Sequence, residues 1–189
     1  MTLAVDTREQ ILETARDLLQ RLTYHAFSYS DISAEVGIRK ASIHYHFPTK
    51  EDLGVAIVDV YLDEFFTWRA NLEANRISPL AKLQAYFEMF GCIATDKICP
   101  LGTLSASVAG LPERLQEKLR ELIYTHRAWL RETLKLGQEC GEIISDQPHV
   151  ELSALVGSSL LGALQIARAT GTREIYDAVV NQLNRTLKA

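Results

Sequence analysis

The sequence predicts an all-α protein of about nine helices: an N-terminal three-helix domain with a helix-turn-helix, followed by a larger helical domain. Apolar residues recur at intervals of three and four in nearly every segment, and no stretch alternates long enough to form a convincing strand. With 189 residues, 47% of them hydrophobic, the chain can bury one sizeable core or two smaller ones. Two short helical segments that meet at Gly37 indicate the helix-turn-helix.

The first helix is expected to begin at Thr7, whose hydroxyl would cap it while Gln10 reaches back in a T-x-x-Q box. The helix should end near Thr23. Its buried face is predicted from one apolar stripe, formed by Ile11, Leu12, Ala15, Leu18, Leu19 and Leu22.

The second helix is predicted to follow Ser30 and to stop at Gly37, since glycine tolerates the left-handed backbone conformation that ends many helices. The third helix should cover roughly residues 39–46. Pro48 closes it, because a proline disfavours helical geometry in the residue before it.

The remaining helices are marked by further capping residues, prolines and glycines. Thr49 can cap a long helix with Asp52 at its third position, and the apolar stripe of this helix reaches the early seventies. We expect residues 1–52 to form the first domain and residues 53–189 the second. Later helix starts are indicated at Ser78–Pro79, at Leu111–Pro112, between Asp146 and Pro148, and after Gly171–Thr172.

The chain contains no stretch that we interpret as crossing a membrane. Its longest uncharged segment runs from Leu152 to Ala167 and is shorter than the ~20 residues that a spanning helix needs, so we expect a buried helix there. The first residues carry Asp6 and Glu9 and no apolar run, so no secretory signal is expected. These features predict a cytoplasmic protein without a membrane partner.

The most informative stretch is residues 37–53, GIRKASIHYHFPTKEDL, which concentrates basic and aromatic side chains. The whole chain carries a net charge of −4, so a nucleic-acid partner would have to be recognised through such a local patch. No carboxylate occurs between Val36 and Lys50. A run of Lys, Arg and His more often forms only a solvated helix face, but the glycine turn and the missing carboxylates favour a surface that contacts DNA.

The third helix has one inward and one outward arc. With about 100° between successive residues, Ile43 and Phe47 turn inward. Lys50 lies in the first turn of the next helix, where backbone amides favour an anion, so we expect it to hold a DNA phosphate. The outward arc, which would enter a major groove about 12 Å wide, presents Lys40, Ala41, His44 and Tyr45.

Residues 27–53, FSYSDISAEVGIRKASIHYHFPTKEDL, closely resemble the N-terminal signature of the TetR/AcrR family of bacterial transcriptional regulators, I-A-x-x-x-G-V-S-x-G-x-L-Y-x-H-F-x-x-K-x-x-L. The resemblance implies a ligand-responsive regulator, most commonly a repressor, that binds a near-palindromic double-stranded DNA operator as a homodimer. A small-molecule effector would release it from the operator. No cofactor, metal or catalytic residue is expected.

The resemblance also implies roles for individual residues. Those that would hold the DNA backbone are Ser30, Ser42, His46 and Lys50, and those that would approach bases are Arg39, Lys40, Ala41, His44 and Tyr45. The chain departs from the family pattern at this surface, with Arg39 where serine is common, Ala41 where glycine is common and His44 where tyrosine is usual. Tyr24 follows Thr23, where a glycine commonly ends the first helix. These departures imply that the protein prefers an operator sequence different from those of its relatives.

Regulators that resemble this chain bind an effector in the C-terminal domain. The helical pattern is interrupted by Gly91, Pro100 and Gly102, and such irregularity often borders a cavity. Aromatic residues at helical spacing more often form plain core, and a lone histidine is more often a core residue than a ligand contact. Few charged residues lie nearby, so we expect a mainly apolar effector. The candidate lining residues are Phe65, Trp68, Tyr86, Phe90, Cys99, Leu104, Val108, Tyr124, His126 and Trp129.

The last two helices are expected to form a two-fold dimer interface. They carry more apolar and small residues than one thin domain would comfortably expose. Dimerisation would place two copies of the third helix one DNA turn apart, about 34 to 36 Å. The candidate interface residues are Leu155, Val156, Ser159, Gly162, Ala163, Ile166, Val179, Leu183 and Leu187.

Three alternatives stay open at this point. Cys92, Cys99 and Cys140 indicate neither a disulfide framework nor a zinc site. A thiol-based redox or electrophile sensor that binds DNA is the first alternative. An enzyme using Cys99 or His126 is disfavoured, because no Ser/His/Asp or Cys/His grouping and no phosphate loop is recognisable. A helical interaction module without DNA binding would show no salt-dependent binding to duplexes.

Overall fold

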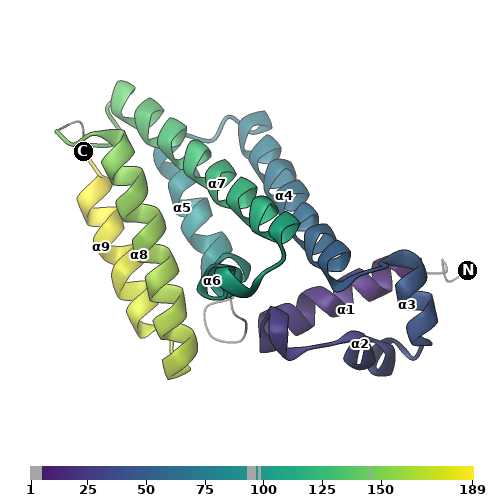
Figure 1. The fold of residues 1–189 in the computed structure, drawn as a ribbon. Helices are drawn as coiled ribbons and strands as arrows, with labels where there is room; N and C mark the ends of the chain where they lie inside the picture. The colour runs from purple at the N-terminus through teal and green to yellow at the C-terminus, as the bar shows by residue number, and fades with distance from the viewer. Residues whose placement is uncertain (1–5, 93–96, 98, 145) are drawn as a thin grey trace, which may run out of the picture.

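The computed structural model describes residues 6–92, 97, 99–144 and 146–189, and these form two groups of helices joined by one long helix (Figure 1). The N-terminal group consists of α1 (Thr7–Leu22), the short 3-10 helix η1 (Tyr24–Ala26), α2 (Tyr29–Val36) and α3 (Lys40–His46). The long α4 (Lys50–Ala74) leads into the second group. That group contains α5 (Pro79–Gly91), α6 (Pro100–Ala106), η2 (Val108–Gly110), α7 (Glu113–Glu139), α8 (His149–Thr170) and α9 (Glu174–Leu187).

The predicted all-α fold class is confirmed, with nine α-helices and no β-strand in the described residues. In the second group, α7 packs against α4, α5 and α8, and α8 packs against α9. The helices α8 and α9 run side by side at the end of the molecule farthest from α2 and α3 (Figure 1). Among the described residues, α1 of the N-terminal group packs against both α4 and α6.

Most predicted helix boundaries, both starts and ends, agree with the structure, because they depend on local capping residues. Gly37 ends α2 in the left-handed conformation, with φ of 75°. Thr49 and Asp52 form the expected capping box at the start of α4. Ser78 caps α5, whose first residue is Pro79.

α1 begins at Thr7 as predicted, but its predicted cap is wrong, and the predicted start of α2 is wrong as well. Asp6, and not Thr7, is the N-cap of α1, and its carboxylate accepts a hydrogen bond from the amide of Arg8. An ionised carboxylate one residue upstream satisfies the first-turn amides and complements the helix dipole, so the Thr7 hydroxyl is not needed as a cap. In the same way, Ser28 starts α2 before Ser30, with Asp31 completing a capping box.

The exit from α1 has an unusual backbone conformation. Thr23 has φ of 97° and ψ of 162°, in a region that is populated almost only by glycine. The chain turns sharply here so that Tyr24 enters the core, where it is 4% exposed. The structure thus places a strained β-branched residue at the position where the family pattern commonly has glycine.

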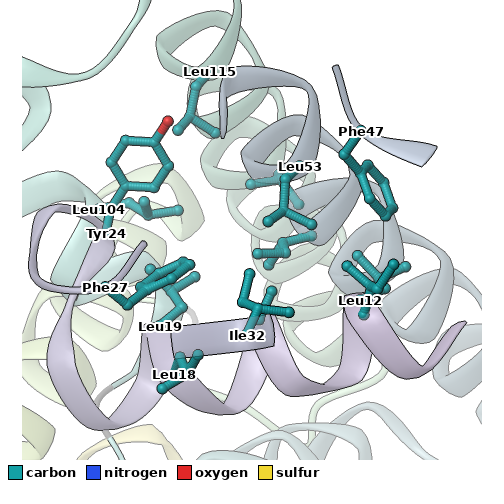
Figure 2. Close-up of a cluster of buried hydrophobic side chains, with 14 of the residues drawn as sticks. Leu12, Leu18, Leu19, Tyr24, Phe27, Ile32, Phe47, Leu53, Leu104 and Leu115 are labelled. Carbon is teal, nitrogen blue, oxygen red and sulfur yellow. The ribbon is translucent and has the colours of Figure 1, made fainter. Parts of the chain in front are cut away.

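The two groups share one hydrophobic core around α1 (Figure 2). Leu53 of α4 and Leu115 of α7 face the stripe of α1, together with Tyr24 and Leu104 (Figure 2). Gly54 permits this close approach, since a Cβ added there would lie 2.9 Å from a Leu115 methyl carbon and 3.0 Å from the Tyr24 ring. A movement of α4 or α7 therefore acts directly on the packing of α1.

The second core lies between α4, α5, α7, α8 and α9, and α8 runs through its middle. α8 has 22 residues and is long and apolar enough to cross a membrane by length and composition alone. Leu152, Val156 and Leu160 bury one face of it in this core. On another face, Leu155 and Ile166 remain 47% and 48% exposed, so the subunit leaves apolar surface uncovered.

Candidate functional site

The first candidate site is the outward face of α3. The inward residues are as predicted, with Ile43 fully buried and Phe47 2% exposed. The opposite face is exposed, and Tyr45 projects furthest, with 83% of its surface accessible. The structure presents these residues together on one surface: Arg39, Lys40, Ala41, His44 and Tyr45.

The positive charge of this surface is not neutralised within the subunit. Arg39 is the N-cap of α3 and makes no capping hydrogen bond through its side chain. Neither Arg39 nor Lys40 is within ion-pair distance of a carboxylate in the described chain. These cations are therefore available to an anionic partner such as a DNA phosphate or to the acceptors of a guanine edge.

The orientation of the His44 ring is set by two contacts. Its Nδ1 donates a hydrogen bond to the carbonyl oxygen of Pro48 at 3.2 Å, and its ring packs edge-on against Tyr29 at 4.8 Å between centroids. Because a carbonyl oxygen only accepts, the hydrogen of the neutral ring must be on Nδ1. The other nitrogen, Nε2, is then an acceptor for an external donor.

Three predicted backbone contacts lie beside this face. Ser30 is exposed in the first turn of α2, while Ser42 and His46 are half-buried on α3. The His46 ring packs edge-on against Tyr45, with 5.1 Å between centroids. Their contact with a DNA backbone stays a prediction.

Lys50 is placed differently from the expectation of an open phosphate contact. Its ammonium group donates to the carbonyl oxygen of Phe27 and lies 4.8 Å and 4.5 Å from the ring centroids of Tyr24 and Phe27. Burial lowers the pKa of this amine. A contact between Lys50 and phosphate would require the side chain to leave these internal partners.

The second candidate site consists of two adjoining cavities in the helical domain. The α1-side cavity, of about 440 Å³, lies between α1, α4, α5, α7 and the start of α6. The α8-side cavity, of about 380 Å³, lies between α5, α6, α7 and α8. Both volumes are in the usual range for small-molecule sites. The wall between them is formed by the residues that line both: Phe90, Cys99, Leu101 and His126.

His126 is the polar centre of this wall. Its Nδ1 lies 3.0 Å from the hydroxyl oxygen of Tyr86, and its ring stacks on Phe65 with 3.9 Å between centroids. Burial lowers the pKa of His126 to about 4, so the imidazole is neutral at physiological pH. The wall between the two cavities is therefore apolar and aromatic, with one neutral hydrogen-bonding pair.

The structure brings six of the ten predicted pocket residues to these cavities. Phe65 and Trp68 line the α1-side cavity and Tyr86 the α8-side cavity, in addition to the shared Phe90, Cys99 and His126. The other four do not line either cavity. Leu104 is in the core around α1, Trp129 belongs to the aromatic cluster behind the cavities, and Val108 and Tyr124 are 40% and 61% exposed.

The sequence interpretation missed Arg16 and Gln20 of α1, which line the α1-side cavity. It also missed the α8 residues along the other cavity, among them Ser153 and Gly157. No local pattern identifies these residues, because they reach the cavities only through contacts between helices far apart in the sequence.

The predicted dimer residues divide into two sets. Val156, Ala163, Leu183 and Leu187 are buried in the core of their own subunit. Leu155, Gly162 and Ile166 are exposed, and Ser159 and Val179 are half-buried. The exposed and half-buried residues form the surface that a second subunit can cover.

Two known proteins match the sequence of this chain over most of its length. The HTH-type transcriptional regulator LmrA of Bacillus subtilis (strain 168) is 26% identical over 185 residues, which cover 95% of this chain and 98% of LmrA. The HTH-type transcriptional repressor DhaR of Mycobacterium sp. (strain GP1) is 26% identical over 178 residues, covering 90% of this chain and 86% of DhaR.

Two solved structures superpose on this chain over nearly its whole length. A TetR family transcriptional regulator from Agrobacterium tumefaciens superposes with a TM-score of 0.91 at 33% identity, covering 96% of this chain and 97% of its own. A TetR transcriptional regulator from Legionella pneumophila gives 0.89 at 29% identity, with 100% of both chains covered.

Family models match the two domains separately. The model described as bacterial regulatory proteins of the tetR family matches residues 11–57, which contain α2 and α3. The model described as tetracyclin repressor-like, C-terminal domain, matches residues 79–183, which contain most of the cavity walls. The chain therefore belongs to the TetR family of DNA-binding bacterial transcriptional regulators.

Proposed function

We propose that the protein is a dimeric cytoplasmic repressor, which binds a near-palindromic operator through α3 and leaves it when a small molecule occupies the helical domain. The observation that carries the proposal is the exposed, unneutralised face of α3. Arg39 and Lys40 supply charge to it, while His44 and Tyr45 supply groups that can contact base edges.

Dimerisation gives this face its specificity. One α3 covers only a few base pairs, whereas two copies about one DNA turn apart recognise a symmetric site. The exposed apolar residues of α8, Leu155 and Ile166, supply a surface for a second subunit far from the DNA-binding end. We therefore assign the dimer interface to α8 and α9, with Ser159, Gly162 and Val179 at its half-buried and exposed positions.

Release by an effector requires that the ligand bind one arrangement of the domains more tightly than another. α4 carries Phe65 and Trp68 in the wall of the α1-side cavity and Leu53 in the core around α1. A ligand that displaces the middle of α4 would move its N-terminal end and, with it, the spacing of the two α3 helices. In this mechanism α4 transmits the effect of a bound ligand from the cavity to the DNA-binding helices.

The thiol-sensor alternative receives little support from the environment of the cavity cysteine. Cys99 is 3% exposed, and burial raises the pKa of its thiol. A protonated, enclosed thiol is a poor nucleophile towards oxidants and electrophiles. We therefore favour a non-covalent effector in the cavity, and serine replacement of the exposed Cys92 and Cys140 tests the sensor alternative outside it. Replacing Cys99 by serine should leave effector-induced release from DNA intact.

The operator test is a selection of bound duplexes from a random pool, using the purified full-length protein. The proposal predicts enrichment of a two-fold-symmetric sequence whose half-sites are centred about one helical turn apart. A Lys40→Ala, Tyr45→Ala variant that keeps its helical content is the matched control and should enrich no sequence. Failure of the natural chain to enrich any duplex at low ionic strength would refute the proposal.

A further inference from the structure

The α1-side cavity has an apolar interior and a charged rim. Its interior is formed by aromatic and aliphatic side chains such as Phe65, Trp68 and Leu122. Its rim contains the charged side chains Arg16, Glu64 and Lys97, all of them partly exposed. Two of these three groups are cations, and each cation is held by one carboxylate, Arg16 by Glu64 and Lys97 by Asp17.

Arg16 is the better enclosed member of an ion pair. Its Nη2 donates to both carboxylate oxygens of Glu64, at 2.7 Å each. The side chain of Arg16 is 25% exposed and that of Glu64 is 53% exposed. The guanidinium also lies 4.8 Å from the ring centroid of Tyr61, which holds it at the rim independently of Glu64. Glu64 is therefore the partner that another anion can replace at the smaller cost.

Two further features favour an incoming oxygen-rich group. The hydroxyl oxygen of Tyr61 is buried, interacts with the Arg16 guanidinium and makes no hydrogen bond of good geometry among the residues that the structure describes. The ammonium of Lys97 lies 3.1 Å from Asp17 of α1, so the second rim cation is likewise held by an exchangeable surface ion pair. A cavity with these groups offers one hydroxyl and two cations beside an aromatic chamber.

We propose that the α1-side cavity binds an amphiphilic organic anion, with an aromatic or aliphatic body in the chamber and a carboxylate or sulfonate held by Arg16 in place of Glu64. This inference rests on the proposed function, because it treats this cavity as the effector site. It changes the expectation of a mainly apolar effector by adding one acidic group. It also supplies the regulatory step, since the displaced Arg16–Glu64 pair joins α1 of the DNA-binding domain to α4.

A neutral apolar effector would behave differently. It would fill the same chamber among Phe65, Trp68 and Phe90 but would leave Arg16 paired with Glu64. The two ligand classes are therefore separated by the dependence of binding on the charge of Arg16 and Glu64.

The test compares two fluorescent probes that share one ring system. Anilinonaphthalene sulfonate carries an anionic group, and N-phenylnaphthylamine lacks it. Each is titrated into the full-length protein without DNA. The proposal predicts saturable binding of both probes. It also predicts that Arg16→Gln weakens binding of the sulfonate by about 10-fold or more, because a charge-assisted hydrogen bond is lost. Binding of the neutral probe should be unchanged.

A second variant keeps the test decisive if Arg16→Gln alters folding. Glu64→Gln removes the competing carboxylate, so it should tighten binding of the sulfonate several-fold and leave the neutral probe unaffected. Arg114→Gln is the matched control, since it breaks another ion pair between α7 and the start of α4, Arg114–Asp52, but does not line the cavity. It should change neither probe.

Three results would overturn the proposal: no saturable binding of the sulfonate, equal losses for both probes in Arg16→Gln, or no gain in Glu64→Gln. None of these results bears on DNA binding, which the duplex selection measures separately. Failure of the cavity assignment is thereby distinguished from failure of the proposed regulatory function.

Discussion

Arg16 on α1 and Glu64 on α4 are 48 residues apart in the sequence, yet the guanidinium Nη2 of Arg16 lies 2.7 Å from both carboxylate oxygens of Glu64. The pair links the DNA-binding domain to the helix that lines the cavity. Both side chains are partly exposed, so solvent screens their attraction. We therefore expect the Arg16–Glu64 ion pair to position α1 against α4. It should contribute little to the free energy of unfolding.

A double-mutant cycle tests this expectation. The free energy of unfolding would be measured by denaturant titration for the natural chain, Arg16→Gln, Glu64→Gln and the double variant. We expect a coupling energy of about 1 kcal/mol or less, as for other partly exposed ion pairs. A coupling of several kcal/mol would mean that the pair is a major stabilising contact, and its exchange for a ligand would then be too costly.

Thr23 provides a second prediction. Its backbone, with φ of 97°, is in a region that strains every residue except glycine. Thr23→Gly should therefore raise the free energy of unfolding by about 1 kcal/mol, because relief of strain exceeds the added flexibility of the unfolded chain. Thr23→Ala, which keeps a Cβ, is the control and should give no such gain. Equal stability of the two variants would show that Thr23 is not strained.

His126 predicts a pH dependence of stability. Burial lowers its pKa to about 4, whereas an unfolded histidine has a pKa near 6.5. As the pH falls through this window, the unfolded chain takes up a proton that the folded chain does not, so stability decreases. Between pH 7 and pH 5 the loss from this group should be about 2 kcal/mol.

The measurement is the free energy of unfolding at both pH values for the natural chain and for His126→Gln. The loss attributable to the imidazole should vanish in the variant. His25→Gln, which removes an exposed imidazole, controls for the general effect of losing a histidine. Parallel pH profiles for the natural chain and His126→Gln would contradict the assignment.

His44 should determine one base of each half-site. With Nδ1 bound to the carbonyl oxygen of Pro48, Nε2 of the neutral ring is an acceptor suited to the amino group of adenine or cytosine. His44→Ala should reduce discrimination at that base by about 1–3 kcal/mol, measured with duplexes that carry single substitutions. A uniform loss of affinity across all duplexes would instead indicate a phosphate contact.

The features that the sequence predicted correctly depend on neighbours along the chain. The exposed face of α3 follows from the inward positions of Ile43 and Phe47, and the left-handed Gly37 follows from its own lack of a side chain. The start of α1 at Thr7 was predicted correctly, but its capping residue was not, because two acceptors, Asp6 and Thr7, compete for the same amides. The local sequence does not determine which of the two side chains caps the helix.

The cavities were predictable only in part, because their walls combine helices that are distant in the sequence. The aromatic residues on α4 and α5 correctly indicated that the cavities lie between these helices. Helical periodicity does not show, however, that Trp68 lines a cavity whereas Trp129 lies behind the cavity wall. Arg16 was missed since nothing in the sequence of α1 indicates that its polar face meets Glu64. The division of α8 between core and exposed surface likewise depends on how it packs against α7 and α9.

The most direct test of the account is the affinity of the purified protein for its selected duplex, compared with the same duplex after insertion of about half a helical turn between the half-sites. Two α3 helices on one dimer can reach both half-sites only when these face the same side of the DNA. We predict at least about a 100-fold loss of affinity for the lengthened duplex, since one half-site contact is lost. Equal affinity for the two duplexes would contradict a paired DNA-binding surface.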